Sequence, residues 1–181
     1  MFTKLFMGLG LIILSPCLAD TLFQPLGHDA KALTQQPEWN LTIFPDGRNL
    51  PDGEGYAAQG KQIFAQKCAA CHGPAGIGGS ADPLTGEVGS LTSDYPEKTV
   101  NSYWPYATTL FDYIRRAMPI DAPFSLSPDE VYALCAYILS QDGIIDAETI
   151  MNNTSLPKVI MPNRDGFIRF YPEKPRPDLK D

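Results

Sequence analysis

Three stretches in the middle of the chain carry apolar residues at the spacing of a helix face. The first is Tyr56–Ala70. Its small or apolar residues recur every four positions, at Gly60, Phe64 and Cys68, and so share one helix face. The second is Thr108–Ala117, whose apolar stripe is ended by a proline shortly after it. Both stretches therefore predict helices.

A third stretch carries a helix start signal as well as a periodic pattern. Ser127 and Glu130 have the spacing of a capping box, and Pro128 occupies the first helical position. Apolar residues then follow at i, i+3, i+4, i+7 and i+8, namely Val131, Leu134, Cys135, Ile138 and Leu139. Gly143 is placed to end this helix.

The segment between the first two predicted helices, residues 73–107, is long and rich in glycine and proline. No alternating strand pattern competes with the helical ones anywhere in the chain. We therefore expect an all-α domain. A long loop inside a small helical domain also indicates a bound group that fills its centre.

The N-terminus has the three parts of a secretory signal peptide. Met1–Lys4 is short and basic, Leu5–Leu14 is apolar, and small residues precede a cleavage site after Ala19. A run of ten apolar residues is too short to span a bilayer, which takes about 20. We therefore expect a periplasmic protein without a stable membrane span. An uncleaved anchor or a buried helix is the alternative, and a lipoprotein through Cys17 is disfavoured by the proline before it.

The predicted organisation has four parts. These are a signal peptide over residues 1–19, an irregular N-terminal extension over 20–53, a helical domain over 54–143 and an irregular C-terminal extension over 144–181. Prolines near the C-terminus favour extended backbone there. The two extensions either wrap a partner or are ordered against the helical domain.

Length and charge narrow the possible functions. The 181 residues allow one compact domain with extensions, and 21 acidic against 14 basic residues give a net charge of −7. Loss of Lys4 with the signal peptide would change this charge to −8. An acidic chain lacks the basic face that nucleic acid requires, so no nucleic-acid partner is expected. Four cysteines are also too few for a disulfide framework in a chain of this length.

The sequence Cys68-Ala69-Ala70-Cys71-His72 has the form of a c-type haem attachment motif. Two thiols at this spacing can add across the haem vinyl groups as thioethers, and the adjacent histidine can reach the iron as proximal ligand. Shuffled chains of this composition would contain such a match about once in a thousand. The motif therefore predicts one covalently bound haem c, held by Cys68, Cys71 and His72.

Other uses of these cysteines fit the sequence less well. A zinc site needs two further ligands, yet only Cys135 and His28 remain in the mature chain, and neither has a paired neighbour. A thioredoxin-type pair would expect a βαβ pattern, and a disulfide has no use for His72. Cys135 is expected to be a buried, unreactive thiol of the third helix.

The sixth coordination position of the iron decides between a carrier and a catalyst. Met118 follows His72 by 46 residues, just past the second predicted helix, so its thioether could fold over the opposite face of the haem. Met161 and His28 are alternatives, as is an open position that would permit ligand binding or catalysis. Methionine is also common in cores. We expect Met118 to be the ligand.

Together these motifs resemble class I cytochromes c. The resemblance is carried by Gly60, Phe64, the CAACH motif, Met118-Pro119 and Ala136-Tyr137-Ile138. It implies that Gly60 lets the last helix cross the first closely, with Tyr137 as its aromatic partner. It also implies that the carbonyl of Pro83 accepts a hydrogen bond from the proximal histidine.

More specifically, the chain resembles the cytochrome subunit of sulfite and sulfane dehydrogenases, the Sox-type sulfur-oxidising molybdoenzymes. The matching stretches are Phe44–Gly55, Ser102–Pro119, Leu126–Leu134 and Met161–Phe167. Two features depart from the pattern. Cys135 stands where a small or β-branched residue is expected, and the chain has one CxxCH motif whereas some relatives carry two haem domains.

The resemblance implies an electron-transfer subunit without catalytic residues of its own. A molybdenum-containing sulfite or sulfane dehydrogenase subunit would oxidise the sulfur substrate and pass electrons singly to the haem. The haem would then reduce a soluble cytochrome or an oxidase. A free-standing periplasmic shuttle to a terminal oxidase is the alternative. A haem enzyme or gas sensor with an open iron would require that Met118 is not a ligand.

Two groups of side chains have alternative roles. Tyr103, Trp104 and Tyr106 could line the haem crevice and donate to a propionate, or belong to an ordinary aromatic core. Arg115 and Arg116 could pair with propionates or with acidic residues of a partner, or lie on a solvated helix face.

Overall fold

The structure is a computed structural model that describes residues 40–168. The chain separates into two compact units, Met1–Asn40 and Leu41–Asp181, and the description that follows is of the second. The predicted signal peptide and His28 lie outside the described residues. Among residues 40–168, no helix is both long enough and apolar enough to cross a membrane.

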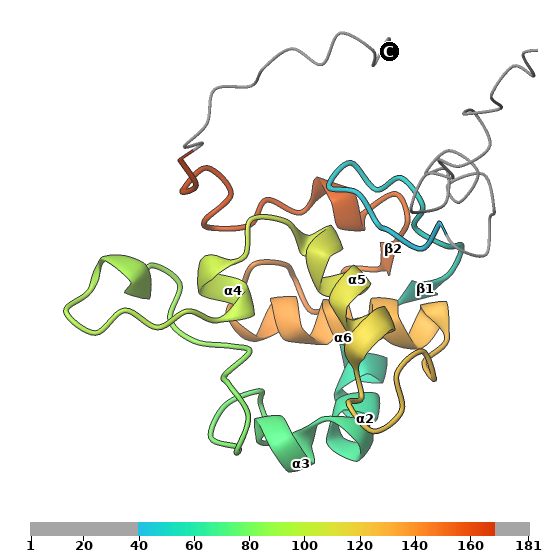
Figure 1. The fold of residues 1–181 in the computed structure, drawn as a ribbon, viewed down its shortest axis with the longest axis horizontal. Helices are drawn as coiled ribbons and strands as arrows, with labels where there is room; N and C mark the ends of the chain where they lie inside the picture. Colours follow the sequence, from blue (N-terminus) through green and yellow to red (C-terminus); the bar gives the residue numbers. More distant parts are fainter. Residues whose placement is uncertain (1–39, 169–181) are drawn as a thin grey trace, which may run out of the picture. The chain divides into compact units, whose positions relative to one another are not determined.

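Helices dominate the described part of the chain (Figure 1). In chain order the elements are β1 (Glu54–Gly55), α2 (Ala57–Lys67), α3 (Ala69–His72), the 3-10 turn η2 (Ser90–Thr92), α4 (Val100–Tyr103), α5 (Ala107–Ala117), α6 (Pro128–Gln141), β2 (Met151–Asn152) and the 3-10 turn η3 (Leu156–Lys158). The three long helices α2, α5 and α6 correspond to the three predicted ones, so the expected all-α fold is confirmed. The first predicted helix is divided at Cys68, where φ is −124°, into α2 and α3.

Helix α6 forms the centre of the core. All nine residues from Val131 to Leu139 are buried, so this helix is enclosed on every side. Its start is the predicted capping box, in which Glu130 N–H donates to Ser127 Oγ at 3.3 Å and Ser127 N–H donates to Glu130 Oε2 at 2.8 Å. Cys135 is fully buried, as expected, and burial raises the pKa of its thiol far above the ordinary value.

Helices α2 and α6 cross closely at Gly60. A Cβ atom on Gly60 would overlap the carbonyl oxygen of Ala133 and would lie 2.7 Å from Tyr137 Cβ, so only glycine fits. The Phe64 and Tyr137 rings pack beside the crossing, with centroids 5.2 Å apart. The close crossing and its aromatic partner, both expected from the sequence, are confirmed. The Tyr137 hydroxyl also donates to the carbonyl of Pro74 at 3.2 Å.

The long segment between α3 and α5 is more ordered than its composition indicated. It contains η2 and α4, and α4 begins at Thr99, whose side chain accepts from Ser102 N–H. Asn101 of α4 is fully buried, and its Nδ2 donates to the carbonyl of Ile138 at 2.8 Å and to Asp142 Oδ2 at 2.7 Å. These two hydrogen bonds attach the loop to the C-terminal end of α6.

Residues before and after the helical region contribute to the same core. Ile43, Met151, Leu156 and Met161 are all buried within it, each at most 6% exposed. Strands β1 and β2 pair antiparallel, with Gly55 opposite Met151. The parts of the two extensions that the structure describes are thus packed against the helices and against each other.

Candidate functional site

The CAACH residues lie within one turn of helix. Cys68 caps both the end of α2 and the start of α3, and its carbonyl accepts from Cys71 N–H at 3.1 Å and from His72 N–H at 3.0 Å. Cys71 is exposed, whereas Cys68 and His72 are half-buried. Burial raises the pKa of the Cys68 thiol to about 11, with Lys67 opposing the shift. The structure therefore brings the two thiols and the imidazole together, as the sequence predicted.

The imidazole of His72 is oriented by a backbone carbonyl. Its Nδ1 lies 3.1 Å from the carbonyl oxygen of Asp82. A carbonyl can only accept, so this hydrogen bond requires the proton on Nδ1 and leaves Nε2 of the neutral ring free to bind a metal. The sequence analysis assigned this role to the carbonyl of Pro83, and the structure places the preceding residue there instead.

The loop after His72 folds back tightly on the motif. Ala81 N–H donates to the carbonyl of Cys71 at 2.9 Å, and Leu84 N–H donates to the carbonyl of Gly76 at 2.8 Å. These bonds fix the backbone on both sides of Asp82, which explains why its carbonyl faces the ring. A Cβ atom on Gly79 would overlap the carbonyl oxygen of Cys71, so this return also depends on glycine.

Met118 lies at the C-terminal end of α5. Its N–H donates to the carbonyl of Ile114 at 3.0 Å, and its side chain is partly exposed. By contrast, Met151 and Met161 are each 1% exposed in the core. Of the three methionines within residues 40–168, Met118 is therefore the one that is not buried.

Several apolar side chains around these residues are only partly covered. They pack against the core from α2, from the CAACH motif, from the following loop and from both ends of α5, and include Ile63, Cys68, Leu84, Trp104 and Met118. Such partial cover is what apolar residues show when they face a bound apolar group. With a nitrogen donor and two thiols in the CAACH motif, and a methionine at position 118 that is not buried in the core, the residues present fit a haem c.

The aromatic residues before α5 contact other parts of the protein. Trp104 packs edge-on against Tyr113 with centroids 5.6 Å apart, and Tyr103 packs edge-on against Phe167 at 5.3 Å. The guanidinium of Arg164 lies 5.8 Å from the centroid of the Tyr106 ring. These contacts connect the chain at the start of α5 to Tyr113 farther along that helix, and to Arg164 and Phe167 of the C-terminal extension.

Arg116 is engaged within its own helix. Its Nε and Nη2 donate to the two carboxylate oxygens of Asp112, each at 2.9 Å. Asp112 Oδ1 also accepts from Ile43 N–H at 3.3 Å. Asp112 therefore joins α5 to the N-terminal extension.

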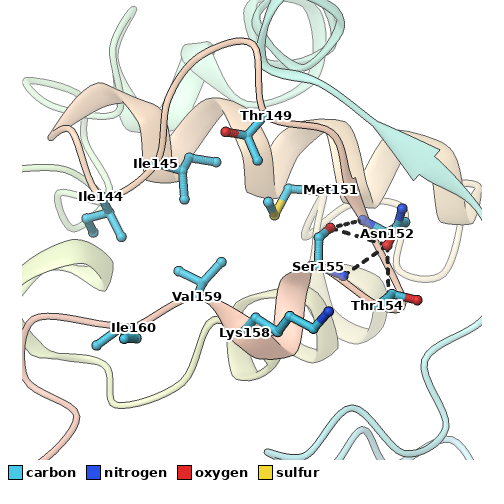
Figure 2. Close-up of a pocket in the computed structure, with 10 residues that line it drawn as sticks. All are labelled: Ile144, Ile145, Thr149, Met151, Asn152, Thr154, Ser155, Lys158, Val159 and Ile160. Carbon is cyan, nitrogen blue, oxygen red and sulfur yellow. Dashed lines mark hydrogen bonds between the residues drawn. The ribbon is translucent and has the colours of Figure 1, made fainter.

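A cavity of about 540 Å³ lies elsewhere, in the segment after α6 (Figure 2). Its walls include Ile144, Ile145, Val159 and Ile160, and Lys158 is the charged residue among those that line it. It is lined by residues 144–160 and by none of the four predicted haem-binding residues. Among residues 40–168, no three His, Cys, Asp or Glu side chains come close enough to form a metal site.

Three residues whose hydrogen bonds hold the loops and extension around the helices were not identified from the sequence. They are Asp82, Asn101 and Asn163, whose Nδ2 donates to the carbonyl of Tyr103 at 2.8 Å. The spacing Thr99-x-x-Ser102 is a capping signal that could have revealed α4 and with it Asn101. Asp82 and Asn163 carry no comparable local signal.

Comparison with known proteins shows which family has this arrangement of helices and haem-binding motif. The family model for cytochrome c matches residues 57–142. The crystal structure of the sulfane dehydrogenase SoxCD from Paracoccus pantotrophus contains a similar chain, with a TM-score of 0.70 and 35% identity, covering 84% of this chain and 72% of that one.

Two curated relatives are named thiosulfate dehydrogenase. The protein from Stutzerimonas stutzeri is 29% identical over 156 residues, and that from Psychrobacter arcticus is 27% identical over 149. These alignments cover 77% and 76% of this chain but 48% and 40% of the relatives. The chain thus spans about half the length of the curated relatives that it matches.

The matched region includes the CAACH motif, the α2–α6 crossing and Met118. Its haem cofactor is a single haem c, bound covalently, and its function is electron transfer. The sulfur-oxidising character of its relatives connects it to thiosulfate and sulfane dehydrogenases. On the family match and the 35% identity to a chain of SoxCD, this protein belongs to the cytochrome c family, with the class I fold.

Proposed function

We propose that Cys68 and Cys71 would attach the haem and that His72 and Met118 would supply the two protein ligands of its iron. The observation that carries this proposal is the hydrogen bond between His72 Nδ1 and the Asp82 carbonyl, because it directs Nε2 away from the protein backbone. The enclosure of Met151 and Met161 in the core supports Met118 as the second ligand.

Each residue then has a defined task. The bound haem supplies a one-electron couple of its iron. Cys68 and Cys71 would attach it covalently at α3, and the Asp82 carbonyl holds the His72 ring in one orientation and increases its basicity. Met118 would supply its thioether to the iron, which would favour the reduced state and exclude substrates from the metal. The chain would therefore carry electrons without making or breaking bonds.

We further propose that the protein is exported to the periplasm, where it accepts electrons from a molybdenum-containing sulfite or sulfane dehydrogenase subunit. The similarity to a chain of the sulfane dehydrogenase SoxCD supports this assignment, and the thiosulfate dehydrogenases support a sulfur substrate. A downstream soluble cytochrome or oxidase would then reoxidise the haem.

The ligand assignment is tested by spectroscopy of the haem-loaded protein. Iron ligated by a methionine sulfur has a weak absorption band at the red end of its oxidised spectrum. Met118→Ala should remove this band while the covalent haem remains. Met151→Leu, a swap of similar volume at a methionine outside the segment that contacts the chain before α5, is the matched control and should retain it. A band that survives Met118→Ala would show that Met118 is not the ligand.

The partner assignment is tested by purification from the native periplasm during growth on reduced sulfur compounds. We expect a molybdenum protein to co-purify, and sulfite or another reduced sulfur compound to reduce the haem in that complex. The purified cytochrome alone should not be reduced by the same compound. Recovery of the cytochrome free of any molybdenum protein would favour the shuttle instead.

A further inference from the structure

We propose that residues Met161–Phe167, named here the C-terminal strap, position α5 and thereby stabilise the bond between Met118 and the haem iron. Asn163 is the central positioning residue of the strap. This inference rests on the proposed ligation of the iron by Met118.

The strap holds the backbone just before α5 through two neighbouring contacts. Asn163 Nδ2 donates to the carbonyl of Tyr103 at 2.8 Å, and the Phe167 ring packs edge-on against the Tyr103 ring at 5.3 Å. Tyr103 ends α4, so a contact to its carbonyl fixes the direction in which the chain enters α5. The guanidinium of Arg164 lies over the ring of Tyr106, the residue that caps α5.

The strap is itself held in place. Met161 is 1% exposed and anchors one end of it in the core. Arg164 N–H donates to the carbonyl of Met161 at 3.1 Å, and Gly166 N–H donates to the carbonyl of Asn163 at 3.2 Å. A Cβ atom on Gly166 would overlap the Asn163 amide, so the turn encloses that side chain. The donor of the key hydrogen bond is therefore preoriented.

Helix α5 connects the strap to Met118. The helix runs from Ala107 to Ala117 with Met118 as its C-terminal cap, and its buried face is Leu110, Phe111 and Ile114. An α-helix of this length moves as a unit, so a shift at its start is transmitted to its end. The contacts that orient His72 come from residues 71–84 and involve no strap residue. Loosening the strap should therefore weaken Met118 ligation while leaving haem attachment unchanged.

The experiment measures how readily added imidazole replaces the sixth ligand in the oxidised, haem-loaded protein. Imidazole binds only iron that Met118 has released, so its apparent affinity reports the fraction released. Asn163→Ala and Asn163→Asp both remove the donor to the Tyr103 carbonyl. Each should bind imidazole roughly 3 to 10 times more tightly than the native protein, as expected for the loss of one hydrogen bond. The reduction potential should fall in the same variants, since it depends on the methionine bond.

Asn153→Ala is the matched control. Its Nδ2 donates to Asp52 Oδ1 at 3.0 Å, away from the strap, and imidazole affinity should remain within twofold of native. Unchanged affinity in both Asn163 variants, an equal change in the control, or loss of covalent haem would overturn the proposal. If the ligand assignment itself is wrong, the result differs. Either the native protein lacks the methionine absorption band, or the Met118→Ala variant retains it.

Discussion

His72 and Met118 are held by contacts of different range along the chain. The carbonyl that orients His72 is 10 residues away, in a loop that folds back on the CAACH motif. The helix that carries Met118 contacts Ile43, which is 69 residues from its partner Asp112, and the chain just before that helix contacts Asn163, which is 60 residues from Tyr103. The His72 side is thus held by contacts that are close in sequence, whereas the Met118 side also has long-range contacts from the two extensions.

This difference separates two tasks of a cytochrome. Local contacts can form the attachment side early, because closing a short loop costs little entropy. Long-range contacts on the methionine side can change without disturbing attachment. Changes in the extensions are therefore a route to adjusting Met118, the proposed ligand, without altering the attachment residues.

The largest expected effect comes from a change that damages both sides together. Gly60→Ala would place a methyl group against the carbonyl oxygen of Ala133, where backbone cannot yield as a side chain can. We expect a loss of about 3 kcal/mol or more of unfolding free energy, as for other overpacked cores, with lower haem content and weaker methionine ligation. Denaturant unfolding measures it, and Gln66→Ala on the exposed face of α2 is the control. A Gly60→Ala protein within 1 kcal/mol of native stability would contradict the close crossing.

Damage confined to the His72 side is expected from Gly79→Ala. The new Cβ would overlap the Cys71 carbonyl oxygen and lie 2.6 Å from Gly73 N, at a cost of about 2–4 kcal/mol. Gly78→Ala is the matched control, since its Cβ meets nothing within 4 Å and only the left-handed conformation, about 1 kcal/mol, opposes it. The amount of covalent haem per chain should fall in Gly79→Ala and remain near native in Gly78→Ala. Equal haem content in the two variants would show that the loop's return does not matter for attachment.

Damage confined to the Met118 side is expected from Asp112→Ala. This change removes both the acceptor for Ile43 N–H and the partner of Arg116, and should cost about 1 kcal/mol. Imidazole should bind the oxidised protein about twofold more tightly, with haem content unchanged. Arg116→Ala removes only the exposed ion pair and should cost about 0.5 kcal/mol or less. If the two variants lose equal stability, the contact to Ile43 contributes nothing.

The smallest effect is expected from removing the ion pair that joins α2 to α6. Lys67 Nζ is 2.7 Å from Glu130 Oε1, and this contact, followed by the Ser127 backbone, lowers the pKa of Glu130 from 4.5. A carboxyl with a lowered folded-state pKa adds stability above its unfolded pKa and loses it as the pH falls through the folded value. Native protein should therefore exceed Glu130→Gln by less than about 1 kcal/mol at neutral pH, since both side chains are about one-third exposed.

That stability difference should shrink as the pH falls below about 4.5. Unfolding free energies of the two proteins, measured between pH 3 and pH 7 (roughly the range in which the carboxyl titrates), check this expectation. Lys67→Ala should show the same small loss at neutral pH. A difference that persists unchanged at the acidic end would rule out the ion pair as its source.

The sequence predicted the parts of the fold that depend on local signals. The capping box at Ser127 and the apolar periodicity after it defined α6, because each is a short-range or strongly periodic pattern. The crossing of Gly60 and Tyr137 was expected from the resemblance to class I cytochromes c, since no local pattern pairs residues on two helices so far apart in sequence. Helix α4 was missed because four residues carry no usable period, although Thr99 and Ser102 marked its start.

The candidate haem-binding residues were named from the sequence, whereas most of the contacts that support them were not. The CAACH motif states its chemistry directly, whereas the register of an irregular loop does not, so the orienting carbonyl was placed one residue too late. The contact between Asn163 and Tyr103 joins residues 60 apart, and no single-sequence pattern specifies such a pairing. The sequence favoured Met118 over Met161 by its position after the second helix, and the burial of Met161 adds support that periodicity alone does not give.

The pairing of β1 with β2 has a consequence for the use of this protein as a module. The cytochrome c family model matches residues 57–142. Four buried residues outside that range pack into the same core, namely Ile43, Met151, Leu156 and Met161. A fragment cut at the family limits would expose apolar cavities where these four side chains pack, and such cavities cost about 1 kcal/mol or more each. The transplantable electron carrier is therefore the helical region together with both flanks, joined where Gly55 meets Met151.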